Sequence, residues 1–215
     1  MNKSNNEIAI EYLSQIDSKI QSLNIKGIGL NNKQDEELYL TLKILKTKIN
    51  QLNITLPFNI LISDKPDIRI QTENINIGIE ITFALNETLQ KAKRIRDKLD
   101  PSLILEPSLY KNNKGRDYIL KTLNKSNNRL IGSAYSNDEL EYEVVEIILR
   151  AIEKKLKKYN SYSKFDKNYL FLYSDVLLAD EHKIINLIIE KISYLNHENF
   201  DRIILRLQGK NYKLK

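Results

Sequence analysis

The sequence is poor in several residue types on which many functional sites depend. Its 215 residues include no cysteine, no tryptophan, one methionine and two histidines. Without cysteine the chain has no disulfide, no thiolate nucleophile and no cysteine-based zinc site. The two histidines, His182 and His197, are isolated from each other, which excludes a histidine-rich metal centre. Any metal chemistry must therefore use oxygen ligands.

Long apolar runs and the common catalytic motifs are also missing. No apolar stretch approaches the roughly 18 residues that a membrane-spanning helix needs, and the amino terminus is polar, without the hydrophobic core of a signal peptide. We therefore expect a cytoplasmic protein with no membrane partner. The chain has no phosphate-binding GxxxxGK loop, no GxGxxG after a strand, no GxSxG elbow and no HExxH pair. Nucleotide hydrolysis, dinucleotide chemistry, serine hydrolysis and zinc proteolysis are not expected.

The composition is that of one globular domain with a modest excess of basic residues. The chain is 41% hydrophobic and 29% charged, with 34 basic and 28 acidic residues and a net charge of +6. This apolar fraction suffices for a sizeable core, and the length fits a single domain. Lysine, asparagine and isoleucine are abundant, as an AT-rich coding sequence would give whatever the function. The net charge alone favours a polyanionic partner only weakly.

Hydrophobic periodicity predicts helices that alternate with strands. Apolar residues at helical spacing predict helices at 9–23, 33–52, 84–99, 118–123, 138–159 and 180–194. Alternating or continuous apolar runs predict strands at 58–62, 67–72, 75–82, 103–105, 169–173, 202–207 and 212–214. This order predicts an α/β fold with helices on both faces of a sheet. Within one domain, 1–215, we expect a helical extension at 1–30, a motif-bearing core at 33–105 and a completion at 138–215.

A hairpin with a two-residue turn at 73–74 is the most informative segment. The pairing that this turn dictates puts Ile68 opposite Ile79 and Asp67 opposite Glu80. The isoleucines of both strands then share one face, and the two carboxylates share the other. The register that buries the apolar face thus brings two carboxylates together, with their Cβ atoms about 5 Å apart.

Two adjacent carboxylates favour a bound cation or a shared proton, because two like charges at this distance repel each other. Carboxylates, a backbone carbonyl and waters are the ligands that Mg²⁺ prefers, and Mn²⁺ accepts the same set. Such an ion lowers the pKa of a bound water and polarises a phosphodiester. The pair therefore predicts metal-assisted hydrolysis of phosphodiester bonds.

The same residues resemble the motif of the PD-(D/E)xK nuclease superfamily, which has the restriction-endonuclease-like fold. The matching residues are Pro66-Asp67 at the start of one strand and Glu80-Ile81-Thr82 on the next, with a helix before and a helix after the hairpin. The resemblance implies a central mixed sheet with an antiparallel meander, flanked by helices on both faces. It also implies that Asp67 and Glu80 bind Mg²⁺, with the Ile81 carbonyl as a third ligand.

The chain departs from the family at one catalytic position. Thr82 stands where the family usually has the lysine that orients the attacking water and stabilises charge on the phosphate, and it resembles branches with Glu-x-Thr. Thr82 would then hold or orient a water. The resemblance implies that a basic residue from a nearby helix replaces the lysine, and Lys155 and Lys158 are the candidates. Gln90 resembles a glutamine that some members use near the metal, and Glu37 an acidic residue that many members add from the preceding helix.

These observations predict an endonuclease or exonuclease, and they leave alternatives open. We expect nucleic acid as the partner, DNA ahead of RNA, and a dimer if the chain assembles. Gly78 leaves a flat strand surface that a substrate backbone could approach. The first alternative is a catalytically inactive protein of this fold that binds nucleic acid or a protein, as Thr82 suggests. The second is a structural subunit without nucleic-acid contact, and the third is that Asp67 and Glu80 merely line an exposed hairpin face.

Overall fold

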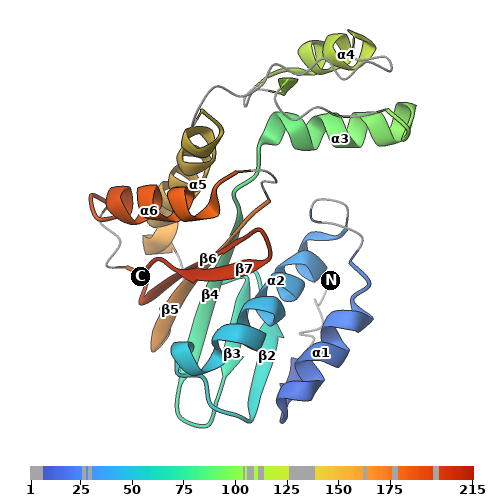
Figure 1. The fold of residues 1–215 in the computed structure, drawn as a ribbon. Coiled ribbons are helices and arrows are strands. Elements are labelled where there is room, and N and C mark those ends of the chain that lie inside the picture. The colour runs from blue at the N-terminus through green and yellow to red at the C-terminus, as the bar shows by residue number, and fades with distance from the viewer. Residues whose placement is uncertain are drawn as a thin grey trace.

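A computed structural model gives the fold of the chain. The structure describes residues 7–25, 28, 31–103, 105, 109–110, 114–125, 139–161, 164–175, 179–195 and 199–215. It consists of one seven-stranded sheet with helices packed on both faces (Figure 1). The expected α/β class with a mixed sheet is therefore confirmed. Within the described residues, no helix is long and apolar enough to cross a lipid bilayer.

The strands lie in the sheet in the same order as in the chain. The strands are β1 (Glu7–Ile10), β2 (Phe58–Ile62), β3 (Ile68–Gln71), β4 (Asn76–Phe83), β5 (Lys167–Ser174), β6 (Arg202–Leu207) and β7 (Lys210–Lys213). Strands β1 to β4 form an antiparallel meander, β4, β5 and β6 run parallel, and β7 returns antiparallel to β6. The helices are α1 (Leu13–Ser22), α2 (Lys33–Lys48), α3 (Glu87–Leu99), α4 (Arg116–Lys125), α5 (Glu139–Lys158) and α6 (Glu181–Ile192).

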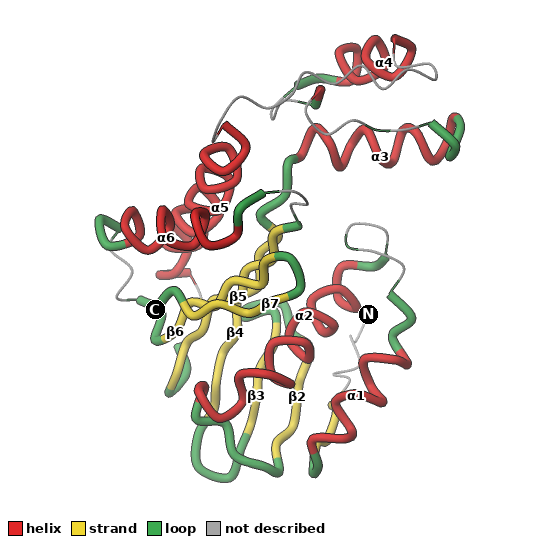
Figure 2. Tube along the Cα trace, viewed as in Figure 1, coloured by secondary structure: helices red, strands yellow, loops and turns green. Residues whose placement is uncertain are grey.

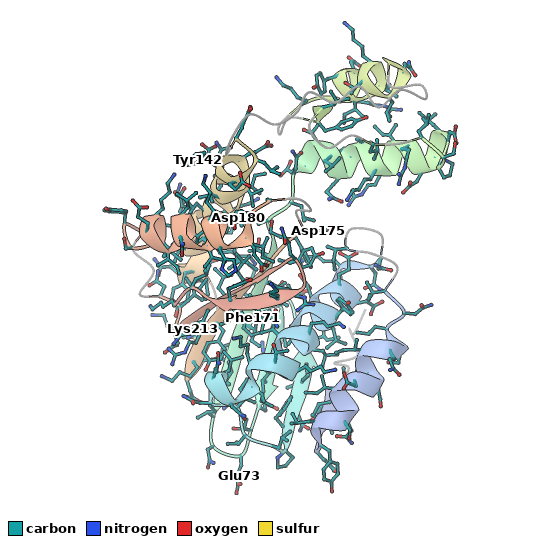
Figure 3. All side chains as sticks on the ribbon, viewed as in Figure 1. Glu73, Tyr142, Phe171, Asp175, Asp180 and Lys213 are labelled. Atoms are coloured by element: carbon teal, nitrogen blue, oxygen red, sulfur yellow. The ribbon has the colours of Figure 1, made fainter. Side chains whose placement is uncertain are left out.

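The β3–β4 hairpin has the register that the isoleucine pattern predicts. Ile68 pairs with Ile79 and Ile70 with Ile77. The Thr72 N–H donates to the Ile75 carbonyl at 3.0 Å, which closes the two-residue turn. Figure 3 shows labelled Glu73 at the tip of this hairpin, at the opposite end of the molecule from α3 and α4.

Two hydrophobic cores lie on the two faces of the sheet. The isoleucines of β3 and β4 are fully buried against α1 and α2, and this core includes Ile16 and Leu38. On the other face, Leu170 and Leu172 of β5 pack with the apolar sides of α5 and α6, among them Ile152. Figure 2 shows these two helical pairs on either side of the strands. β4 therefore has one apolar face toward α2 and one face toward α5.

Helices α3 and α4 form a separate unit that projects beyond one end of the sheet (Figure 1). We call residues 87–99 and 114–125 the α3–α4 arm. Ala92, Ile119 and Leu123 of the arm form a small core together with Tyr110, which lies between its two helices in the chain.

The structure corrects two of the predicted elements. Ala9 lies in β1, not in a helix, because Glu7–Ile10 pairs with β2 and buries Ile10. The strand predicted at 103–105 is wrong for its described residues, since Leu103 closes a turn after α3 by donating its N–H to the Asp100 carbonyl. His197 lies outside the described residues, and His182 is exposed at the start of α6.

Candidate active site

The structure brings Asp67 and Glu80 together at the end of the β3–β4 pairing. Asp67 directly precedes β3. Strand β4 is longer than β3 and continues past Ile79, the last of its residues that pairs with β3. The Ile81 N–H, which has no β3 partner there, donates to Asp67 Oδ2 at 2.8 Å. Asp67 and Glu80 are only 6% and 5% exposed. The interpretation of an exposed polar hairpin face is therefore wrong.

Lys155 reaches both carboxylates from α5. Its Nζ lies 2.7 Å from Glu80 Oε2 and 3.4 Å from Asp67 Oδ2. The Lys155 side chain is 18% exposed. It follows the buried Ile152 by three residues, so it continues the face of α5 that packs on the sheet. Lys158 is exposed at the end of the helix. Of the two lysines proposed from the sequence, Lys155 is the one placed at the carboxylates.

Helix α2 contributes two more charged residues from its first turns. The Asn32 side chain accepts the Asp35 N–H at 2.9 Å, and this N-cap fixes the start of the helix at Lys33. Lys33 Nζ lies 2.8 Å from Glu37 Oε1 and 3.5 Å from Asp67 Oδ1. Glu37, expected only as an accessory residue, is 2% exposed.

The five residues form a row in which the sign of the charge alternates. The order is Glu37, Lys33, Asp67, Lys155 and Glu80, and we call them the carboxylate–lysine cluster. Asp67 is central because each of its oxygens contacts a different lysine. Sequence reasoning missed Lys33, although its spacing of four residues from Glu37 is that of an ion pair along a helix.

Burial shifts the protonation of the glutamates in the cluster. Burial raises the pKa of Glu37 to about 7, since the nearby Asp67 charge adds to it and the Lys33 amine only partly opposes it. Burial also raises the pKa of Glu80, and here Lys155 opposes the shift while Asp67 adds to it. Burial lowers the pKa of Lys33, but its contacts with Glu37 and Asp67 outweigh this and leave the pKa raised. Glu37 therefore changes its charge close to neutral pH.

The carboxylate pair suits a hard divalent cation. Among the described residues, no group of three or more His, Asp or Glu side chains is arranged to hold a metal ion. Glu80 Oε1 is nevertheless buried and accepts no hydrogen bond from the described residues, beside a second carboxylate. Such an oxygen is costly unless a cation or donor satisfies it. Mg²⁺ is commonly bound by one or two carboxylates and keeps its other ligands as water. Asp67 and Glu80 therefore fit such an ion.

The other residues singled out from the sequence lie on β4 and on α3. Thr82 is half-buried on β4, two residues after Glu80 and hence on the same side of the strand. Gln90 lies on α3, in the α3–α4 arm. Gly78 does not offer the open surface that we expected, because a Cβ atom there would lie 2.6 Å from Phe165 Cδ2 and 3.1 Å from Pro66 Cγ. The Phe165 ring fills this space.

Comparison with known proteins does not add to this description. No family model, no curated protein and no solved structure matches the chain. Its function must therefore be inferred from the chemistry of the carboxylate–lysine cluster.

Proposed function

We propose that the carboxylate–lysine cluster is the active site of a Mg²⁺- or Mn²⁺-dependent nuclease of the restriction-endonuclease-like fold. It would hydrolyse phosphodiester bonds of nucleic acid, DNA ahead of RNA. One observation carries the proposal: the two carboxylates of the motif and a lysine from a distant helix meet within 2.7–3.4 Å. The sheet order and the flanking helices are compatible with that fold.

Three groups of the chain would hold the metal ion. Asp67 and Glu80 supply carboxylate oxygens, including Glu80 Oε1, which accepts no hydrogen bond from the described part of the chain. The Ile81 carbonyl is the third, because the N–H and C=O of one strand residue point to the same side of the strand and the Ile81 N–H already faces Asp67. When bound, the ion supplies an acidified water and polarises the phosphodiester.

The other residues of the cluster would manage charge and protons. In hydrolysis, the water oxygen bonds to phosphorus and the water proton passes to a base. The bond from phosphorus to the leaving oxygen breaks, and its electron pair stays on that oxygen, which takes a proton from solvent. Glu37 can accept that proton because its pKa of about 7 lies near the working pH. Lys155 can turn from Glu80 toward the phosphate and stabilise its charge there. Thr82 would orient the water from the same side of β4.

Cleavage assays on the full chain test this proposal. Fluorescent single-stranded and double-stranded DNA are incubated with Mg²⁺ or Mn²⁺, and with EDTA as the blank. We expect metal-dependent cleavage that Glu80→Gln abolishes and that Lys155→Met lowers on the order of 10²–10³-fold. Lys157→Met removes an exposed lysine of the same helix and should leave the rate unchanged.

Calorimetry separates loss of metal binding from loss of chemistry. The wild-type chain should bind Mg²⁺ or Mn²⁺, and Asp67→Ala should abolish this binding. The proposal fails if the chain cleaves neither form of DNA and no divalent-ion binding depends on Asp67.

A second candidate function is nucleic-acid binding without catalysis. The observation that favours it is the position of the Lys155 amine, which already joins both carboxylates, together with Thr82 at the family's lysine position. This function predicts DNA binding that is sensitive to salt but indifferent to EDTA and to Glu80→Ala.

A further inference from the structure

The positive charge of the chain is concentrated in one segment. Residues 87–125 include ten basic and five acidic residues, a net charge of +5, whereas the whole chain carries +6. An AT-rich coding bias spreads lysines along a chain and does not explain this concentration. The segment contains the α3–α4 arm, which projects from the sheet. The location of this charge is therefore more informative than its total.

A groove between α3 and α4 gathers these charges. It has a volume of about 520 Å³, and five of its lining residues are basic: Lys91, Arg94 and Lys98 from α3, Lys114 just before α4, and Arg116 at the start of α4. All five are exposed. Among the described residues that line it, none is acidic. The rim of the groove therefore attracts anions.

The floor of the same groove is apolar. It is formed by Ile95, Leu99, Ile119 and Leu120. Leu99 is 62% exposed, so part of this apolar surface is open to solvent and accessible to a ligand. The groove thus pairs a cationic rim with an apolar base.

Hydrogen bonds link α3 to the residues before α4 and link the arm to α5. The Lys114 N–H donates to Thr88 Oγ1 at 2.8 Å, which links the segment before α4 to α3. Asn86, the N-cap of α3, donates from Nδ2 to Glu143 Oε1 of α5 at 3.1 Å. Helix α5 carries Lys155, and β4, which leads into α3, carries Glu80. Both elements that meet in the cluster therefore also support the arm.

We infer that the groove of the α3–α4 arm binds single-stranded nucleic acid. Phosphates of the strand contact the basic rim, and unstacked bases cover the apolar floor. A duplex offers only the first contact, because its bases are stacked inside, whereas a single strand offers both. The inference rests on the proposed function in one respect, since this strand is the one that the carboxylate–lysine cluster would cut.

Fluorescence anisotropy in EDTA tests binding without cleavage. The probes are a labelled 20-nucleotide single strand and its duplex. The groove variant Arg94→Glu with Arg116→Glu changes one cation on each helix, and Lys191→Glu with Lys213→Glu is the control with the same change in charge at exposed sites elsewhere. For the single strand, we expect the groove variant to bind at least tenfold more weakly. Its slope of log affinity against log salt should fall by about 1.4, as for two lost phosphate contacts.

A third variant tests the apolar floor. Leu99→Ser should weaken binding of the single strand and leave the duplex unchanged, because it removes a contact to bases and no charge. Thermal unfolding monitored by circular dichroism confirms that each variant is folded.

Several results would overturn the inference. They are equal binding by the groove and control variants, preference for the duplex, and groove-dependent binding of phosphatidylserine vesicles in place of the oligonucleotide. If DNA is still cleaved in these cases, the proposed function stands without the arm. Groove-dependent strand binding with no metal-dependent cleavage supports the inference and contradicts the proposed function.

Discussion

The carboxylates of the carboxylate–lysine cluster are buried and paired, whereas the charged side chains in the groove of the α3–α4 arm are exposed and of one sign. In the cluster, each carboxylate has a lysine amine within 3.5 Å, and Asp67 and Glu80 are almost completely buried. In the arm, five cations gather on an exposed groove, and none of the described residues that line this groove is acidic. The difference follows from solvation: a buried charge must be neutralised nearby, whereas water screens like charges at a surface.

This comparison separates two kinds of work. The cluster holds charges at fixed short distances, as a chemical step requires. The arm provides a broad attractive field, as the capture of a polyanion requires. Substitutions in the two regions should therefore affect stability very differently, and paired variants can measure the difference.

Lys155 offers the largest expected effect. Lys155→Met leaves Asp67 and Glu80 buried beside each other without their shared amine, and we expect a loss of about 3–5 kcal/mol in the free energy of unfolding at pH 7. Urea denaturation measures it. The exposed Lys158→Met on the same helix should change stability by less than about 0.5 kcal/mol. Equal losses in the two variants would show that the Lys155 ion pairs do not neutralise the site.

Alanine substitutions at Gly78 on β4 and at Gly115 in the arm compare the free space beside the two glycines. Gly78→Ala places a Cβ atom 2.6 Å from Phe165 Cδ2, and the forced shift of the ring should cost about 1–3 kcal/mol. Gly115→Ala in the arm meets no atom within 4 Å and should cost about 0.5 kcal/mol at most. Thermal unfolding of both variants checks this. A larger loss at Gly115 than at Gly78 would contradict the difference in free space beside the two glycines.

The raised pKa of Glu37 predicts how the free energy of unfolding depends on pH. Its pKa is raised from 4.5 to about 7 in the folded state. Between these values the folded chain binds a proton that the unfolded chain has released, so this stabilising contribution is complete below pH 4.5 and is lost as the pH rises through 7. Glu80, whose pKa is also raised, acts in the same direction.

The measurement for Glu37 is the unfolding free energy between pH 4 and 8 for the wild type and Glu37→Gln. The free energy of unfolding of the wild type minus that of Glu37→Gln should decrease with rising pH. Exposed Glu87→Gln on α3 is the control and should not alter the slope. A slope that Glu37→Gln leaves intact would place the titrating group elsewhere.

The smallest effect belongs to the surface ion pairs of the arm. Lys91 Nζ lies 3.8 Å from Glu87 Oε2, and both side chains are more than half exposed. Lys91→Gln should change the free energy of unfolding by less than about 0.5 kcal/mol, because solvent screens such pairs. The urea midpoint measures it, and a loss comparable to that of Lys155→Met would remove the contrast between the two regions.

The β3–β4 hairpin shows what local pattern is able to predict. The alternation of isoleucine, together with a turn that has room for two residues, fixes the register, and the register places Asp67 beside Glu80. These constraints operate within some 16 residues, so no knowledge of the remaining chain is needed. The helical periodicity of α5 also distinguishes the two lysines. Lys155 follows buried Ile152 by three residues and lies on the face of α5 that packs on the sheet, whereas Lys158 is exposed and does not lie on that face.

Other features depend on contacts that the sequence does not record. Strand β1 has only four residues, and the helical spacing of apolar residues from Ala9 onward predicts a helix there. The strand forms because it pairs with β2, about fifty residues later in the chain. The ring that covers Gly78 belongs to Phe165, which follows α5 in the chain and is 87 residues away from Gly78. Lys33 joins the cluster only because α2 packs with its first turn over Asp67.

The strand order has a consequence for biosynthesis. Because neighbours in the sheet are neighbours in the chain, each strand finds the edge of its predecessor ready as it leaves the ribosome. Glu80 and its amine partner on α5 are 75 residues apart. Translation at about 5–20 residues per second separates their appearance by about 4–15 s. The nascent hairpin thus holds two carboxylates before the amine from α5 exists, and the ion pairs of Asp67 and Glu80 with Lys155 form only after the second half of the chain is made.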